Sequence, residues 1–243
     1  MNIRAALRRR IGLVIGTAIA AFLLLACGTL MTLALSPQQA LLAWRIERMP
    51  ELDATAIDAA QAETRLLVTG RLQDNEALEK GGFVAYVAQE WVVTPPASNE
   101  DEAKGSWEKA EQVVPTLTLN VKGQTVHILR TEQVRLSGTL HEELIYSDGS
   151  QEAQYDRESL PEGSQRLQGL LDGDWVTVLG RKASADGILP SELYAGDRVA
   201  FADSKHRAAR GLLIGGIFMI GLAPTVLLGG VLAALLGHRR RFR

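Results

Sequence analysis

Two long stretches without a charged residue lie near the two ends of the chain, at residues 11–35 and 211–237. At 1.5 Å per helical residue, each stretch reaches roughly 35–40 Å as a helix, which is enough to cross a hydrocarbon core of about 30 Å. The sequence therefore predicts two transmembrane helices, and with them the lipid bilayer as a partner.

Basic residues at the extreme ends predict the orientation of these helices, because Lys and Arg concentrate on the cytoplasmic side of membrane spans. Arginines precede the first stretch and follow the second, at positions 4, 8, 9, 10, 239, 240, 241 and 243. We therefore expect a multi-pass protein of the cell (inner) membrane, with both termini cytoplasmic and the central domain extracytoplasmic.

The only cysteine, Cys27, leaves two interpretations of the first stretch. A basic start, an apolar run and the sequence "LLAC" at 24–27 are typical of a lipoprotein signal, which is cut before a cysteine that receives lipid. The chain nevertheless stays apolar over residues 28–35, as a full span requires. We expect an uncleaved helix, and a lipoprotein anchored through Cys27 is the alternative.

Small residues four positions apart mark one face of each predicted span. Gly12 and Gly16 lie in the first, and Gly211 and Gly215 in the second. This spacing lets helix backbones approach closely. We expect these glycines to pack helices together, and a homo-oligomer through the spans stays open.

The segment between the spans is acidic. Residues 36–209 hold all 28 Asp and Glu residues but only 17 of the 26 Lys and Arg residues, a formal charge of −11. Nucleic acid and anionic membrane surfaces are bound mainly through basic residues, so we expect no nucleic-acid partner. A single cysteine also excludes an internal disulfide framework.

Short segments rich in β-branched and aromatic residues, separated by turn residues, predict strands in this central segment. They cover residues 64–72, 82–93, 116–121, 125–130, 142–147, 174–182 and 187–196. Three dipeptides are typical of tight hairpin turns, namely Lys122-Gly123, Asp148-Gly149 and Asp186-Gly187.

Two other segments depart from the strand pattern. Residues 161–173 predict a helix with Leu167, Leu170 and Leu171 on one face. Residues 94–106 are rich in Pro, Ser and acidic residues and predict a mobile hairpin tip. The expected fold is mainly β (α+β), a small OB-like β-barrel or sandwich domain with one inserted helix, between two transmembrane α-helices.

The predicted organisation follows the chain from one basic end to the other. It comprises a cytoplasmic N-terminus (1–10), transmembrane helix 1 (11–35), a juxtamembrane helix and connector (36–63), the extracytoplasmic β domain (64–203), a second juxtamembrane segment (204–210), transmembrane helix 2 (211–237) and a cytoplasmic tail (238–243).

No motif for catalysis, metal binding or cofactor binding is visible in the central segment. "HEEL" at 141–144 lacks the second histidine of a zinc-protease motif, and neither a Ser-His-Asp set nor a Gly-rich phosphate loop is present. The carboxylate pairs 142/143 and 172/174 are expected to be solvated surface groups. An envelope hydrolase or transferase that uses carboxylates is the alternative.

Aromatic residues supply the weak candidates for partner binding. Trp91 and Trp107 flank the acidic loop, and Tyr86 precedes them on the same predicted strand as Trp91. Aromatic side chains combine a large apolar area with a polar edge and often anchor interfaces. Packing within the hairpin is the other interpretation of these residues.

The order of parts resembles a family, the membrane-bound ubiquitin ligases of the mitochondrial MULAN type and their prokaryotic relatives, which share a GIDE or "beside a membrane" (BAM) domain between two spans. The similar stretches are "ATAIDAAQAETRLLVTGRL", "GGFVAYVAQEW", "PTLTLNVKGQTVHILR", "GLLDGDWVTVLGRKASADG" and "LYAGDR". In the family these look like an opening strand, an aromatic-rich strand pair, a hairpin and a closing strand.

The sequence departs from this family at its C-terminal end. The ligases carry a RING whose cysteines and histidine hold zinc, whereas this sequence ends in "HRRRFR". We therefore expect no ligase activity, no cofactor and no catalytic residue. The expected function is that of a non-enzymatic membrane protein that binds a membrane or envelope protein near the bilayer; a structural subunit of a larger membrane complex is a further alternative.

Overall fold

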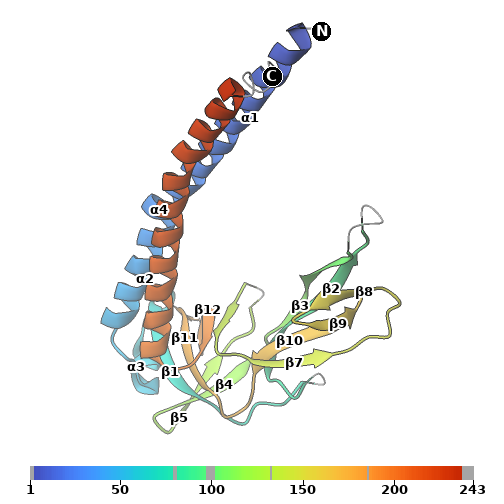
Figure 1. The fold of residues 1–243 in the computed structure, drawn as a ribbon. Helices are drawn as coiled ribbons and strands as arrows, with labels where there is room; N and C mark the ends of the chain where they lie inside the picture. The colour runs from blue at the N-terminus through green and yellow to red at the C-terminus, as the bar shows by residue number, and fades with distance from the viewer. Residues whose placement is uncertain (1–2, 79–80, 97–101, 132, 185, 237–243) are drawn as a thin grey trace. The chain divides into compact units, whose positions relative to one another are not determined.

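The computed structural model describes residues 3–78, 81–96, 102–131, 133–184 and 186–236 (Figure 1). The chain divides into two units. One is helical and consists of the chain up to Arg45 together with the chain from Ala202 onward, and the other is Ile46–Phe201. Each unit is described by itself below.

The helical unit contains α1 (Ile3–Leu30), a π-helical turn (Met31–Leu35), most of α2 (Ser36–Arg48) and most of α4 (Arg198–Leu236). Two segments, Val14–Arg48 and Arg198–Ala234, are long and apolar enough to cross a membrane. The architecture is compatible with the two predicted spans, and both helices run on beyond the uncharged stretches.

Within this unit α1 and α4 lie side by side and meet at small residues (Figure 1). A Cβ atom added to Gly28 would lie 2.7 Å from the carbonyl oxygen of Gly216, and one added to Gly230 would lie 2.2 Å from the hydroxyl of Thr17. The absence of side chains at these glycines therefore lets the two backbones approach each other.

Five strands of the second unit close into a barrel (Figure 1). They are β1 (Arg65–Leu72), β4 (Leu117–Val121), β5 (Gln124–Ile128), β11 (Trp175–Lys182) and β12 (Ile188–Ala195). β1, β4 and β5 follow one another antiparallel, β5 and β12 pair in parallel, and β11 pairs antiparallel with both β12 and β1. This order fits an OB-like barrel, so the predicted mainly β domain between two apolar helices is confirmed.

The barrel interior is the main hydrophobic core. Val68, Leu119 and Ile128 are fully buried there. The short helix α3 (Ala54–Ala59) adds Ile57 to the same core, and the Asp53 carboxylate caps α3 by accepting a 2.8 Å hydrogen bond from an amide of its first turn.

Two insertions into the barrel form a second sheet, which we call the outer sheet. The insertion between β1 and β4 contributes β2 (Ala85–Thr94) and β3 (Lys104–Val113), and the insertion between β5 and β11 contributes β7 (His141–Ile145) and β10 (Gln165–Leu170). β2 and β10 pair, which gives the strand order β3-β2-β10-β7.

The second insertion also forms two smaller features. β6 (Arg135–Gly138) lies parallel to β12 at the edge of the barrel sheet. β8 (Glu152–Tyr155) and β9 (Glu158–Pro161) form a hairpin that packs on β2 and β3. The outer sheet and this hairpin together are called the outer layer below.

The helix predicted at 161–173 is wrong, because these residues contain β10. This strand is central in the outer sheet and pairs with β2 on one side and β7 on the other. Gly169 fits this position because an added Cβ would lie 2.5 Å from the carbonyl oxygen of Ala85. Pairing on two sides therefore overrides the helical spacing of the leucines.

The predicted turns and the predicted loop have mixed outcomes. Lys122-Gly123 joins β4 to β5 with positive φ at both residues, and Asp186-Gly187 lies between β11 and β12, as expected. Asp148-Gly149 is not a tight hairpin turn, since it lies in the long connection from β7 to β8. Of the predicted loop 94–106, Thr94 belongs to β2, residues 104–106 belong to β3, and residues 97–101 lie outside the described residues.

The β unit also contains the C-terminal end of α2 and the first turn of α4. Arg198 donates hydrogen bonds to the carbonyl oxygens of Ile46 (3.0 Å) and Glu47 (2.5 Å). Tyr194 of β12 stacks on Phe201 with ring centroids 4.8 Å apart. A guanidinium at these carbonyls complements the negative end of α2, so Arg198 fixes the two helix ends to each other.

Candidate functional site

The two predicted tryptophans lie directly opposite each other on β2 and β3. Trp91 pairs with Trp107 in the strand register, and their ring centroids are 4.9 Å apart. Tyr155 of β8 contacts both rings edge-on at 5.4 Å. The guanidinium of Arg166 lies 4.7 Å from the centre of the Trp107 ring, which is the geometry of a cation–π contact.

This aromatic cluster lies in the interior of the outer layer. Trp91 is only 3% exposed and packs over Gly105, where an added Cβ would collide with its ring. Tyr86 is 5% exposed and belongs to a neighbouring buried cluster with Phe83 and Leu167. These residues therefore pack the outer layer, and their role in binding a partner stays a prediction.

The predicted glycine faces of the spans do not form the contact between α1 and α4. Added Cβ atoms at Gly12, Gly16, Gly211 and Gly215 would meet nothing within 4 Å. Packing through these glycines accordingly remains a prediction for contacts with another chain. Cys27 lies in α1 with its side chain exposed, and its lipidation is likewise untested.

Members of both acidic pairs make local contacts. Asp174 accepts a hydrogen bond from the Leu171 amide at 2.8 Å, and its other oxygen lies 3.2 Å from Nε2 of His141. Glu142 accepts a hydrogen bond from the Gln168 side chain at 2.8 Å. Among the described residues, no three His, Cys, Asp or Glu side chains gather as metal ligands would.

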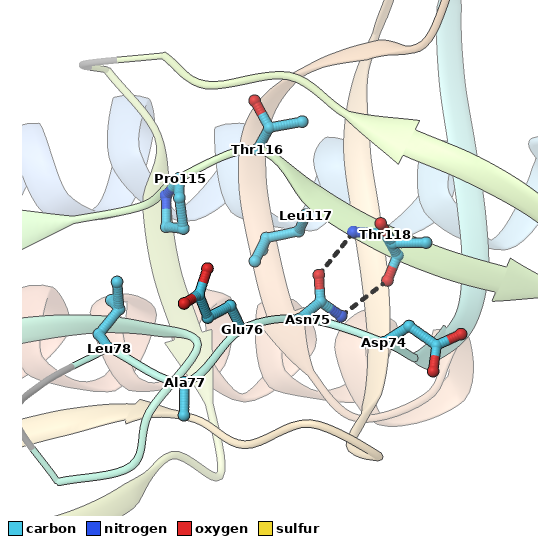
Figure 2. Close-up of a pocket in the computed structure, with 9 residues that line it drawn as sticks. All are labelled: Asp74, Asn75, Glu76, Ala77, Leu78, Pro115, Thr116, Leu117 and Thr118. Carbon is cyan, nitrogen blue, oxygen red and sulfur yellow. Dashed lines mark hydrogen bonds between the residues drawn. The ribbon is translucent and has the colours of Figure 1, made fainter.

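A pocket of about 370 Å³ opens where the first insertion leaves and re-enters the barrel (Figure 2). It is lined by residues 74–78, which follow β1, and by residues 115–118, which lead into β4. We call it the neck pocket. Its size falls at the lower end of the range for ligand pockets, about 300–1,000 Å³.

The side chain of Asn75 joins the two walls of the neck pocket. Its Oδ1 accepts a hydrogen bond from the Thr118 amide (2.7 Å), and its Nδ2 donates to the Thr118 carbonyl (3.0 Å), as Figure 2 shows. Nδ2 also donates to Asp172 at 2.9 Å. A side-chain amide thus continues the strand pairing of β1 with β4 past the end of β1 and links the two walls of the pocket.

The lining of the neck pocket combines an apolar wall with carboxylates. Leu78, Pro115 and Leu117 form the apolar part, and Asp74 and Glu76 supply the charge. Figure 2 shows the Glu76 carboxylate directed toward Pro115 and Leu117, whereas Asp74 points away from them. None of the lining residues that the structure describes is basic.

A second hollow of about 250 Å³ shares Pro115 with the neck pocket. It is lined by residues 111–115 and by Arg130 and Thr131, which follow β5. The two hollows therefore share one proline in their linings, and the second is lined by a charge of each sign, Glu111 and Arg130.

The sequence interpretation missed the neck pocket. Its signals were the polar run "QDNEA" directly after the strand predicted at 64–72 and Pro115 directly before the one at 116–121. Since consecutive strands of a barrel lie side by side, the two ends of a long insertion between them must converge. That argument could have placed these residues together.

Comparison of the chain with models of protein families, with curated proteins and with solved structures finds no match. The geometry of the barrel, the outer layer and the neck pocket therefore supports the functional inference by itself.

Proposed function

We propose that the chain is a non-enzymatic two-span membrane protein whose acidic extracytoplasmic β domain binds a partner protein close to the bilayer. The resemblance of the sequence to GIDE domains is part of the same proposal. Two helices that are apolar enough to cross a membrane flank the β domain in the chain, and this arrangement supports a position of the domain next to a bilayer.

The neck pocket is the observation that carries the binding role. It joins apolar side chains with carboxylates, and Asn75 fixes its walls through hydrogen bonds to the backbone of β4. A preformed pocket with an apolar wall and few polar groups is the usual form of a binding site. OB-like barrels commonly bind ligands at the loop between their first two strands, where this pocket lies.

Photo-crosslinking in the intact membrane tests the proposal. The photoreactive residue p-benzoylphenylalanine is placed at Ala77 in the neck pocket, at Ser106 on β3 or at Thr125 on β5, all of them exposed. We expect a discrete adduct with a second protein from at least one position. Absence of an adduct from all three positions would contradict the binding function.

The orientation has a separate test that uses the single native cysteine. In a Cys27→Ser background, Lys122→Cys places a thiol at an exposed turn of the barrel. We expect a membrane-impermeant maleimide to label this thiol in intact cells. Labelling only after the membrane is permeabilised would place the domain in the cytoplasm.

The Cys27→Ser chain also tests the lipid anchor. An unchanged mass, apart from the substitution itself, and unchanged membrane attachment are expected for an uncleaved helix. Loss of a lipid label or a shift in the size of the mature chain would favour the lipoprotein alternative.

A further inference from the structure

The described residues that line the neck pocket carry charge of only one sign. Asp74 and Glu76 are its ionisable residues, and in the described part of the chain neither carboxylate takes part in a hydrogen bond or an ion pair. By contrast, the Asp172 carboxylate beside the pocket already accepts from the backbone and the side chain of Asn75. The Glu76 carboxylate is therefore available to a ligand.

The shape of the pocket restricts the chemistry of that ligand. Leu78, Pro115 and Leu117 provide an apolar wall next to Glu76 (Figure 2). Lysine and arginine side chains combine a long aliphatic stem with a cationic end, and they lay the stem on apolar surface while the charge meets a carboxylate. A group with an aliphatic stem and a cationic end therefore matches this lining. A purely apolar group would leave the Glu76 carboxylate unpaired, and an anionic group would be repelled by it.

The second hollow favours a polypeptide over a small amine as the source of the cation. It begins at the same Pro115 and continues along residues 111–114 toward Arg130. A small amine fills only the neck pocket, whereas an extended segment can place successive side chains in both hollows. The formal charge of −11 on residues 36–209 favours the approach of a basic segment over an acidic one.

From this lining we infer that the neck pocket receives a lysine or arginine side chain from an extended segment of a partner protein, with Glu76 as the group that pairs with the cation. The inference rests on the proposed binding function and names the chemistry of the partner. Asn75 acts as a positioning residue, because it shapes the pocket without facing the cation.

The test uses the full chain in its membrane, with p-benzoylphenylalanine at Ala77 as the probe. Ala77 lines the pocket and is exposed, and Ala59, at the exposed end of α3, is the matched control position. We expect an adduct from position 77, mapped by mass spectrometry to a partner segment that contains a Lys or Arg within a few residues of the crosslink.

Substitution of the carboxylate then tests the role of Glu76. We expect Glu76→Gln to lower the yield of the adduct three- to tenfold, and Glu76→Lys to abolish it. Glu51→Gln is the control, because Glu51 is also exposed and lies outside the pocket. Thermal unfolding of each variant shows whether the fold is retained, and only variants that unfold at the temperature of the unsubstituted chain enter the comparison.

A synthetic peptide with the mapped sequence separates the charge from the stem. Its binding to the purified full chain in lipid nanodiscs is measured by fluorescence anisotropy, with the basic residue intact or replaced by norleucine. We expect the unsubstituted chain to bind the norleucine peptide at least fivefold more weakly than the peptide with the intact basic residue. We expect the Glu76→Gln chain to bind the two peptides equally well.

The outcomes distinguish this inference from the proposed function. An adduct at position 77 that does not respond to Glu76→Gln, or that maps to a segment without Lys or Arg, overturns the inference and leaves the binding function standing. Adducts from position 106 or 125 without one from position 77 likewise overturn the inference and leave the binding function standing. Absence of adducts from every position overturns both.

Discussion

The barrel and the outer layer of the β unit are built from the same chain but are stabilised in different ways. Every barrel strand pairs on both sides around one continuous core. The outer sheet ends at β3 and β7. Its residues Ala85 and Leu170 belong to the barrel core, and its other buried residues form two smaller clusters, one centred on Tyr86 and one on Trp91. Closure removes sheet edges, whereas an open sheet depends on individual large side chains to cover it.

This difference indicates that the barrel is the more stable region of the β unit and the outer layer the more adaptable one. Regions with smaller cores and free edges open at lower free energy than a closed core does. The neck pocket lies at the boundary, because one of its walls leads into β4 of the barrel and the other belongs to the insertion that forms β2 and β3. A binding segment there touches the rigid barrel and the more adaptable layer at once.

Matched leucine substitutions give the largest expected effect and test the comparison directly. Leu119 in the barrel is fully buried, and Leu160 in the outer layer is 2% exposed. Leu→Ala in a core costs about 2–5 kcal/mol in the free energy of unfolding, according to how well the site can collapse. We expect about 4 kcal/mol for Leu119→Ala and about 2 kcal/mol for Leu160→Ala, measured by denaturant unfolding.

Hydrogen exchange shows how far each of these effects spreads. Leu119→Ala should raise exchange across all five barrel strands. Leu160→Ala should raise it only in β2, β3, β8 and β9. If Leu160→Ala also raised exchange throughout the barrel, the two regions would be a single cooperative unit and the comparison would fail.

Asn75 links the two regions, and its removal should have the next largest effect. Asn75→Ala leaves the partly buried Thr118 amide without its Asn75 partner, whereas the Thr118 carbonyl still accepts from the Gln73 amide, so we expect a loss of about 1–3 kcal/mol. Gln73→Ala is the control, since Gln73 is exposed and, among the described residues, its side chain bonds only that of Asn120. Hydrogen exchange should rise first at residues 74–78 and 171–174, and exchange confined to the outer sheet would contradict this linking role.

How well the sequence predicted these regions follows the same division. The barrel strands were predictable because alternating apolar residues and local turns such as Lys122-Gly123 are visible within short windows. β3 was not, since "KGSWEKAEQV" is mostly polar and forms a strand through its pairing with β2. β10 was taken for a helix because its partners, β2 and β7, come from distant parts of the chain.

The neck pocket escaped prediction for a similar reason. Its walls are about forty residues apart in the sequence, and only the closure of the barrel brings them together. The tryptophans were easier to notice because they are rare, but their neighbours Tyr155 and Arg166 come from the other insertion. Local sequence patterns predict individual strands and helices, whereas the contacts between the two insertions depend on the topology of the barrel.

Arg166 tests the outer layer with a smaller effect. It donates hydrogen bonds to Gln89 and to the hydroxyl of Tyr155 and lies over the Trp107 ring. Arg166→Lys keeps the charge but loses the planar fork, so we expect a loss of about 1–2 kcal/mol and a change in tryptophan fluorescence.

Arg181 of the barrel supplies the control for Arg166. Its ion pair with Glu63 is exposed at both side chains, so Arg181→Lys should change the free energy of unfolding by less than about 0.5 kcal/mol. Equal effects of Arg166→Lys and Arg181→Lys would mean that the cluster around Trp107 does not stabilise the outer layer.

The smallest expected effect concerns the hairpin turns of the two regions, and it is a gain in stability. The barrel hairpin β4–β5 turns at Lys122-Gly123, with φ of 53° and 89°, whereas the outer hairpin β8–β9 turns at Asp156-Arg157, with φ of 44° and 77°. Glycine adopts positive φ without the steric cost that a side chain imposes. Arg157→Gly should therefore stabilise the outer hairpin by about 0.5–1 kcal/mol, seen as slower hydrogen exchange in β8 and β9. Gly123→Arg, the reverse change in the barrel, should lower the free energy of unfolding by a similar amount. A loss of stability on Arg157→Gly would contradict the prediction, because it would show that the Arg157 side chain stabilises the outer layer by more than its backbone strain costs.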